Sequence, residues 1–405
     1  MAESLMFRLL SPAGTPVNYS DLWKAINLRL GQTDIEKMLV EKLQHISGAK
    51  YYYFVNSGRT GLTLILRALS QMSDPVKTEV VIPAYTCFSV PAAIIRAGLK
   101  IRLIDVDPVT LDYNYNQLLT LSMENVLCII GCNLFGIPSN WKELKSVAES
   151  NDTFLIDDAA QAMGSQLGEK ALGLQGDIGF YSLGRGKNMT TYSGGIIVTD
   201  REDIAEYLTN LMHTIPRPGL VGEVVCGIKL FIYSNFLHPH CYWLPSMIPF
   251  LGLGETVFDE SFEIEALSKF QMAMATVLID YLSEYNNVRF ANSKQLSERL
   301  TESDRFTIPG HTKDKFPVYL RFPLLCKNRS TRDQAVATLK RKGIIASKMY
   351  PSTIANIHGI ESHLMNDNLS FPGAQQVVDT LIALPTHPYI SETDIIKMTS
   401  TLTDL

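Results

Sequence analysis

The sequence has 405 residues, of which 46% are hydrophobic and 19% are charged, and its formal net charge is −5 at pH 7. This composition is typical of a globular protein with a large core and excludes a disordered chain. The weak negative charge, without any run of Lys or Arg, argues against a nucleic-acid-binding surface.

Helices and short apolar strands alternate between residues 55 and 200. The first element is a Gly-rich turn that runs into a helix, NSGRTGLTLILRALSQM at 56–72. The predicted elements that follow are a strand at 79–84, a helix from Phe88 to Gly98, strands at 100–107 and 125–133, a helix at 140–150, and strands at 153–160, 177–184 and 194–200. This alternation predicts an α/β fold with a mainly parallel sheet that is covered by helices on both faces.

Residues 230–254, LFIYSNFLHPHCYWLPSMIPFLGLG, contain no Asp, Glu, Lys or Arg. The length of this stretch raises the question of a membrane span. Its prolines, its asparagine and the pair His238 and His240 argue against a spanning helix, so we expect a buried or subunit-facing segment and no membrane span. No third ligand at a suitable spacing accompanies the two histidines, so we expect no metal site.

The character of the sequence changes near residue 255. Residues 263–300 predict one or two long helices, and shorter strand and helix signals follow at 318–325 and 331–343. We therefore expect a large domain over residues 1–255 and a smaller C-terminal α/β domain over residues 256–405.

The six cysteines are scattered and form no CxxC pair: Cys87, Cys128, Cys132, Cys226, Cys241 and Cys326. Cys128 and Cys132 share one predicted strand, where a core position is the simpler interpretation. The first ten residues lack the apolar core of a signal peptide. We expect a cytoplasmic protein with reduced thiols.

Two neighbouring carboxylates, Asp157 and Asp158, end the predicted strand in FLIDDAAQAMG. In open α/β sheets, ligands bind at the carboxyl ends of strands. The alternative is a helix N-cap, because Asp is favoured there and DAAQA is a good helix start. Taken alone, the pair favours the cap.

A single lysine, Lys187, lies among small and hydroxylated residues in SLGRGKNMTTYSGG (182–195). A lysine amine forms a Schiff base with a carbonyl when its pKa is lowered enough to leave it neutral. Pyridoxal phosphate needs such a lysine, a carboxylate for its ring nitrogen and a phosphate site at a helix start. The turn at 56–62 supplies the helix start, and Ser182 could add a hydroxyl. A nucleotide phosphate loop is not supported, because Asn188 stands where Ser or Thr is required.

Six motifs occur in the order found in the DegT/StrS family of fold-type I pyridoxal-phosphate aminotransferases, which the sequence resembles from about residue 30 to its C-terminus. They are NSGRTGL, IPAYTCFSVPAAIIRAGLKIRLIDVDPVTLDYN, NLFGIPSNW, IDDAAQAMGS, GDIGFYSLGRGKNMTTYSGG and ALPTHPYISETDI. Each motif is weak alone, but six in sequence with compatible spacing are specific. The resemblance implies the fold-type I architecture, in which the large domain binds the cofactor.

The resemblance also implies roles for individual residues. Lys187 matches the lysine that holds the cofactor and moves protons, and Asp158 matches the carboxylate that pairs with the pyridine nitrogen. Gln161 matches a glutamine near the phenolic oxygen of the cofactor. The phosphate-binding positions are matched by Gly58, Arg59, Thr60 and Ser182, where Arg59 and Thr60 act largely through backbone N–H groups.

Several positions depart from the family pattern. Arg59 stands where the family usually has Thr, and Cys87 stands at the ring-stacking position, so we expect Phe88 or a shifted chain to stack on the ring. A partner-subunit NYR segment that helps to bind phosphate in relatives is absent from SFEIEALSKFQ (261–271). His387, in LPTHP, is expected to have a structural role.

The resemblance implies an aminotransferase that moves an amino group from an amino acid, by family habit glutamate, to a keto group on a nucleotide-linked sugar. It further implies a homodimer with the active site at the subunit interface. Relatives that dehydrate sugars carry His in place of the lysine, so Lys187 argues against that branch. The alternatives are an enzyme that aminates a non-sugar acceptor and a non-catalytic regulator that keeps the cofactor fold.

Overall fold

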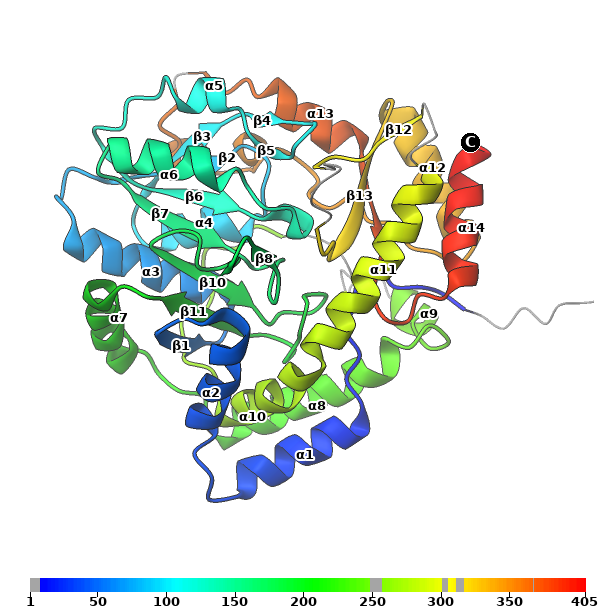
Figure 1. Cartoon of the computed structure of the whole chain (residues 1–405), viewed down its shortest axis with the longest axis horizontal. Helices are drawn as coiled ribbons and strands as arrows, with labels where there is room; N and C mark the ends of the chain where they lie inside the picture. Colours follow the sequence, from blue (N-terminus) through cyan, green and yellow to red (C-terminus); the bar gives the residue numbers. More distant parts are fainter. Residues whose placement is uncertain (1–7, 248–256, 301–304, 311–316, 367) are drawn as a thin grey trace, which may run out of the picture.

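A seven-stranded sheet forms the centre of the computed structural model, which describes residues 8–247, 257–300, 305–310, 317–366 and 368–405 (Figure 1). The strand order is β1-β11-β10-β7-β6-β2-β3. β11 runs antiparallel to both neighbours, whereas the remaining pairs are parallel. These strands are β1 (Tyr51–Val55), β2 (Glu79–Pro83), β3 (Lys100–Ile104), β6 (Val126–Cys132), β7 (Phe154–Asp158), β10 (Ile178–Ser182) and β11 (Gly195–Thr199).

Helices cover both faces of this sheet, and successive side chains of one strand therefore enter different halves of the core. Val80 and Ile82 of β2 pack with α3 and α4, whereas Val81 packs on the other face with residues of α1, α2, α6 and α10. Burial on both faces explains why these strands are continuous apolar runs rather than alternating ones. The helices are α1 (Tyr19–Leu30), α2 (Ile35–Ser47), α3 (Gly58–Met72), α4 (Ser89–Arg96), α5 (Tyr115–Leu118), α6 (Trp141–Ser150), α7 (Glu202–Thr214) and α10 (Lys269–Leu278).

A second sheet, of three antiparallel strands, lies beside the first in the C-terminal part of the chain (Figure 1). Its strands are β12 (Phe306–Thr307), β13 (Arg321–Cys326) and β14 (Leu381–Pro385), and the helices around it are α11 (Leu282–Leu300), α12 (Arg329–Arg341), α13 (Pro372–Thr380) and α14 (Glu392–Thr403). Two-residue strands complete the structure as β4 (Val106–Asp107), β5 (Asp112–Tyr113), β8 (Gln166–Leu167) and β9 (Lys170–Ala171).

The predicted fold class is confirmed: the structure is α/β, with a mainly parallel sheet between helices and a smaller sheet after it. The proposed division at residue 255 falls outside the described residues and stays a proposal. The N-terminal segment reaches across this division, because Leu10 forms a β-bridge with Ile344. Within the described residues, no helix has both the length and the apolar character to cross a membrane.

The uncharged stretch is partly buried and partly exposed in the part that the structure describes, residues 230–247. It forms the end of α8 (Leu220–Phe236) and the short α9 (Trp243–Ser246). Leu230 and Leu237 are buried, but Phe231 and Ile232 are about half exposed. Only one side of α8 packs on the fold, so the expectation of a buried or subunit-facing segment is met by burial at Leu230 and Leu237 and stays a prediction for the exposed positions.

Candidate active site

A cavity of about 160 Å³ lies where the carboxyl ends of β6, β7 and β10 meet the N-terminus of α3. Its volume is about five times the roughly 30 Å³ of one liquid water, so it can hold a small organic ring. Six predicted site residues line it: Gly58, Arg59, Asp158, Gln161, Ser182 and Lys187. Thr60 and Phe88 are buried and are not among the lining residues.

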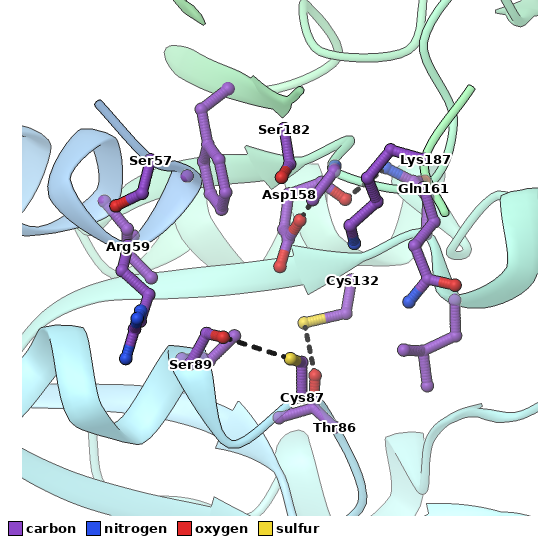
Figure 2. Close-up of a pocket in the computed structure, with 17 residues that line it drawn as sticks. Ser57, Arg59, Thr86, Cys87, Ser89, Cys132, Asp158, Gln161, Ser182 and Lys187 are labelled. Atoms are coloured by element: carbon purple, nitrogen blue, oxygen red, sulfur yellow. Dashed lines mark hydrogen bonds between the residues drawn. The ribbon is translucent and has the colours of Figure 1, made fainter. Parts of the chain in front are cut away.

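Lys187 enters the cavity from the loop that connects β10 and β11. Its backbone carbonyl accepts a hydrogen bond from Thr15 Oγ1 at 2.5 Å, and its N–H donates to Gly184 O at 3.3 Å. Gly186 precedes it with φ of 74°, a left-handed conformation that glycine adopts without strain. The loop is therefore tied down while the lysine side chain points into the cavity (Figure 2).

The surroundings of Lys187 favour a neutral amine. Burial lowers its pKa, the Arg321 guanidinium lowers the pKa further, and Cys87 and Asp158 act in the opposite direction. A neutral lysine amine is the form that attacks a carbonyl. The position of Lys187 thus meets the electrostatic requirement that the sequence could only suggest.

Asp157 and Asp158 point to opposite faces of the sheet, because successive residues of a strand alternate. Asp157 is fully buried and accepts hydrogen bonds from the N–H groups of Gly173 and Gln175 and from the Asn133 amide, at 2.6 to 2.9 Å. Burial raises its pKa to about 7 although these donors oppose the rise. Asp157 is consequently a structural group behind the site.

Asp158 faces the cavity. In the part of the chain that the structure describes, its carboxylate accepts one hydrogen bond, from the Ala160 N–H at 3.0 Å. Burial raises its pKa, whereas the Ala160 N–H and the charge of Lys187 lower it. A buried carboxylate with so few donors needs a cationic partner. The protonated ring nitrogen of a pyridine would supply one, so this residue fits the cofactor.

The alternative role of this aspartate pair, capping a helix, is wrong. Residues after Asp158 form turns rather than a helix. The good helix formers in DAAQA are overridden because the segment must turn back toward β8 and β9. The chain instead places Gln161 beside the cavity.

The start of α3 forms a cradle with Ser182. Ser57 caps the helix by accepting a hydrogen bond from the Thr60 N–H at 3.1 Å. The N–H groups of Gly58 and Arg59 have no acceptor among the described residues, and such free donors at a helix N-terminus bind phosphate. A Cβ on Gly58 would lie 3.2 Å from Ser182 Cβ, so only glycine leaves this gap open.

Gln161 is held from two sides. Its side-chain oxygen accepts the Phe135 N–H at 3.2 Å, and its amide nitrogen donates to the Tyr350 hydroxyl at 3.2 Å. Phe135 has φ of 60°, a conformation that is rare for a large side chain. The two hydrogen bonds fix the orientation of Gln161 beside the cavity.

The group that lines the cavity after β2 is Cys87. Its thiol lies 3.2 Å from Ser89 Oγ, and Figure 2 shows it with Cys132 across from Lys187 and Asp158. Phe88 instead stacks on Tyr350, with ring centroids 6.1 Å apart. The ring-stacking role predicted for Phe88 therefore stays a prediction that this geometry does not favour.

Two residues near the site escaped sequence reasoning. Asn133 lines the cavity, and its place after the end of β6 could have revealed it, because β6 neighbours β7. Arg321, at the start of β13, lies next to the Lys187 loop: a Cβ on Gly186 would be 3.1 Å from its Nη2. Its Nε is buried without a partner, and its Nη1 contacts Met349 Sδ at 3.5 Å. No local pattern around Arg321 points to the site.

The remaining predictions concern a metal site and three histidines. The described residues contain no cluster of three or more His, Cys, Asp or Glu that could hold a metal. His387 is buried, and its Nε2 donates to Ser11 O at 3.0 Å, as expected for a structural group. The ring centroids of His238 and His240 lie 5.4 Å apart, which agrees with packing.

A model of the DegT/DnrJ/EryC1/StrS aminotransferase family matches residues 29–223 and 264–403 of the chain. The uncharacterized protein MJ1066 of Methanocaldococcus jannaschii is 26% identical over 367 residues, which cover 88% of this chain and 86% of that protein. The UDP-N-acetyl-3-dehydro-alpha-D-glucosamine 3-aminotransferase of Acidithiobacillus ferrooxidans is 21% identical over 371 residues, which cover 90% and 87%.

A solved structure has the same fold. The pyridoxal-phosphate form of Spr1654 from Streptococcus pneumoniae, described as a putative sugar aminotransferase, superposes with a TM-score of 0.79. The two chains are 16% identical, and the match covers 98% of each.

Proposed function

The chain belongs to the DegT/DnrJ/EryC1/StrS aminotransferase family of pyridoxal-phosphate enzymes, and on this premise we propose that it transfers an amino group from an amino acid to a keto group on a sugar. One observation carries the proposal: Lys187 and Asp158 line the same cavity, and each perturbs the pKa of the other. A regulator that only bound the cofactor would have less need of both groups.

The residues of the cavity match the parts of the cofactor. Pyridoxal phosphate, when bound, supplies an aldehyde carbon and a pyridinium ring that acts as an electron sink. Lys187 would bind at the aldehyde, Asp158 would hold the ring nitrogen, and Gln161 would lie near the phenolic oxygen. The N–H groups of Gly58 and Arg59 and the Ser182 hydroxyl would hold the phosphate.

The chemistry that this chain contributes is a proton transfer. Lys187 Nζ, whose pKa is lowered by burial, would accept the proton from the α-carbon of the amino donor and return it at the cofactor carbon. A general base of this kind contributes about 10²–10⁴-fold in rate. The Asp158 carboxylate would meanwhile keep the ring nitrogen charged.

We propose that the donor is an α-amino acid, with glutamate as the first candidate. Arg321 supports this assignment, since its guanidinium lies against the Lys187 loop and no carboxylate of the described residues pairs with it. Arginine binds carboxylates through two parallel hydrogen bonds. A donor carboxylate would therefore supply the partner that Arg321 lacks.

The acceptor is proposed to be a keto sugar linked to a nucleotide, which the relative from Acidithiobacillus ferrooxidans supports by its name. We also propose a homodimer with the site near the subunit interface. A cytoplasmic location stays a prediction.

The proposal is tested first by trapping the cofactor. Protein loaded with pyridoxal phosphate and reduced with borohydride is expected to retain the cofactor covalently, which intact-protein mass spectrometry detects. Lys187→Ala should lose this adduct, whereas Lys142→Ala, at an exposed position on α6, should keep it. An adduct that persists in Lys187→Ala would place the reactive amine elsewhere.

The second step measures the reaction. Wild-type protein given glutamate should release 2-oxoglutarate in the amount of bound cofactor, and a nucleotide-linked keto sugar should then allow further turnover. If simple keto acids support turnover and keto sugars do not, the sugar assignment is wrong.

A further inference from the structure

Two segments that the family model does not match pair with each other on the surface. The matched ranges leave out residues 1–28 and 224–263, which contain most of α1, most of α8 and all of α9. Figure 1 shows α1 and α8 side by side at the lower edge of the molecule. The rings of Tyr19 and Phe231 are 5.6 Å apart, and Arg29 forms an ion pair with Glu223 at 2.7 Å.

The outer side of this pair is apolar. We define the α1/α8 face by Trp23 and Leu30 of α1 and by Val221, Val224, Ile228 and Phe231 of α8, all of which are more than half exposed. The four α8 positions are spaced as one stripe of a helix. The opposite side of α8 is anchored in the core by Cys226 and Leu230. An exposed stripe of this kind marks an interaction surface rather than scattered apolar residues.

The charges of the two helices are arranged with one sign outward. Both carboxylates, Asp21 and Glu223, are buried. The exposed charged side chains of these helices are Lys24 and Lys229. Lys24 lies 4.0 Å from Asp21 and donates to the Tyr281 hydroxyl, and Lys229 lies over an aromatic ring. Each helix therefore carries one exposed lysine beside its apolar side chains.

The charges and apolar side chains of the α1/α8 face distinguish between two possible partners, a second copy of the chain and a lipid bilayer. In a two-fold interface between copies, the same patch is present on both sides, so two sets of lysines would meet without an exposed carboxylate on either helix. A bilayer with anionic lipids presents a complementary charge and an apolar layer beneath it. Trp23 and Tyr19 are residue types that favour such an interface.

The length and packing of α8 fit a helix that lies flat on a membrane surface rather than one that spans a membrane. α8 has 17 residues, about 25 Å of helix, and it packs against α1 and α10. α9 continues the apolar surface with Leu244 and Met247 exposed. We propose that the α1/α8 face binds the surface of a lipid bilayer that contains anionic lipids, with both helices in the interfacial plane.

The test is vesicle flotation of the full-length protein. Vesicles of phosphatidylcholine mixed with phosphatidylglycerol in a three-to-one ratio should carry wild-type protein upward, and phosphatidylcholine alone should carry less. Val221→Ser with Ile228→Ser should weaken binding to the mixed vesicles about tenfold or more, because apolar area is lost from the buried face. Val76→Ser with Val109→Ser, at exposed apolar sites elsewhere, should bind as the wild type does.

A second pair of variants isolates the charge. Lys24→Gln with Lys229→Gln should weaken binding to the mixed vesicles about tenfold or more and leave binding to phosphatidylcholine nearly unchanged. Thermal melting checks that all variants are folded, and aminotransferase activity in solution should be unaffected, because the inference is independent of the catalytic proposal.

Three outcomes would overturn the inference. The wild-type protein could fail to float with the mixed vesicles, or the Val221/Ile228 double variant could float as well as the wild type. Analytical ultracentrifugation could also show that this variant dissociates an assembly that binds no vesicles, in which case the face joins two copies of the chain.

Discussion

Asp157 and Asp158 are adjacent in the sequence but have different surroundings, because successive residues of a strand point to opposite faces of the sheet. Asp157 is satisfied by three N–H donors, whereas Asp158 has one and faces the cavity. The sequence placed both at the end of a strand but could not assign them to faces. Because both residues are aspartates on one strand, a substitution of Asp157 serves as the control for the same substitution of Asp158.

We expect Asp158→Asn to weaken pyridoxal phosphate binding roughly 10²–10⁴-fold, since removing one partner of a buried ion pair costs about 3–5 kcal/mol. Asp157→Asn should leave the affinity nearly unchanged but lower the free energy of unfolding by about 1–3 kcal/mol, because buried donors lose their acceptor. Absorbance titration and urea denaturation measure the two effects. Equal affinities for the wild type and Asp158→Asn would rule out the proposed role of Asp158.

The N-terminus of α3 shows how an element creates a binding site. Ser57 caps the helix through the Thr60 N–H, and Gly58 and Arg59 in the first turn line the cavity. The prediction that Thr60 contributes its own N–H is not favoured, because that group is already used. The capping residue therefore holds the first turn of α3 in place and also lines the cavity itself.

Ser57→Ala is expected to lower the free energy of unfolding by about 1 kcal/mol, the usual cost of losing an N-cap. It should also weaken cofactor binding severalfold, because the first turn of α3 loses its fixed geometry. Ser391→Ala, which removes the cap of α14 in the C-terminal part, should cost similar stability without changing affinity. If both variants bind pyridoxal phosphate equally well, the cap of α3 has no role in the site.

The N-terminal segment contacts two distant parts of the molecule. The N-terminal segment pairs with the C-terminal part through hydrogen bonds from Leu10 N–H to Gly343 O and from Ile345 N–H to Leu10 O. It then reaches the active-site loop, where Thr15 Oγ1 donates to Lys187 O and Arg289 donates to Thr15 Oγ1 at 2.7 Å. One extended segment thus links the C-terminal part of the chain to the loop that carries Lys187.

His387 makes this link sensitive to pH. Burial lowers its pKa to about 4, below the ordinary 6.5, so the folded protein favours the neutral ring. The contribution of His387 to the free energy of unfolding is fully present above pH 6.5 and is lost as the pH falls toward 4. The difference between the pKa of the unfolded and the folded protein corresponds to about 3 kcal/mol. The wild type should therefore lose about 3 kcal/mol of unfolding free energy relative to His387→Gln over this range.

Urea denaturation at several pH values measures that difference. The titration of Asp157 has the opposite slope over the same range, because burial raises its pKa to about 7, but it acts equally in both proteins and cancels. Parallel stability curves for the two proteins would show that His387 does not titrate as inferred.

Much of the fold followed from local patterns. The apolar strands, the capped helices α3 and α6, and the parallel order of β7 and β10 were predictable because burial on both faces produces continuous apolar runs. The antiparallel direction of β11 and the exposure of α8 were not. The direction of β11 depends on the path of the loop that connects it to β10. The exposure of α8 depends on which other elements pack against it.

The sequence by itself determined the fold class and the family, because ordered motifs and the alternation of helices and strands are local features. It also predicted Lys187 and Asp158 as the catalytic residues. Tertiary structure alone decided that Lys187 and Asp158 line one cavity. It also decided that Cys87 rather than Phe88 lines this cavity, and that Arg321 of the second sheet lies next to the lysine loop. These outcomes depend on contacts between residues far apart in the chain, and no local pattern encodes where two such segments meet.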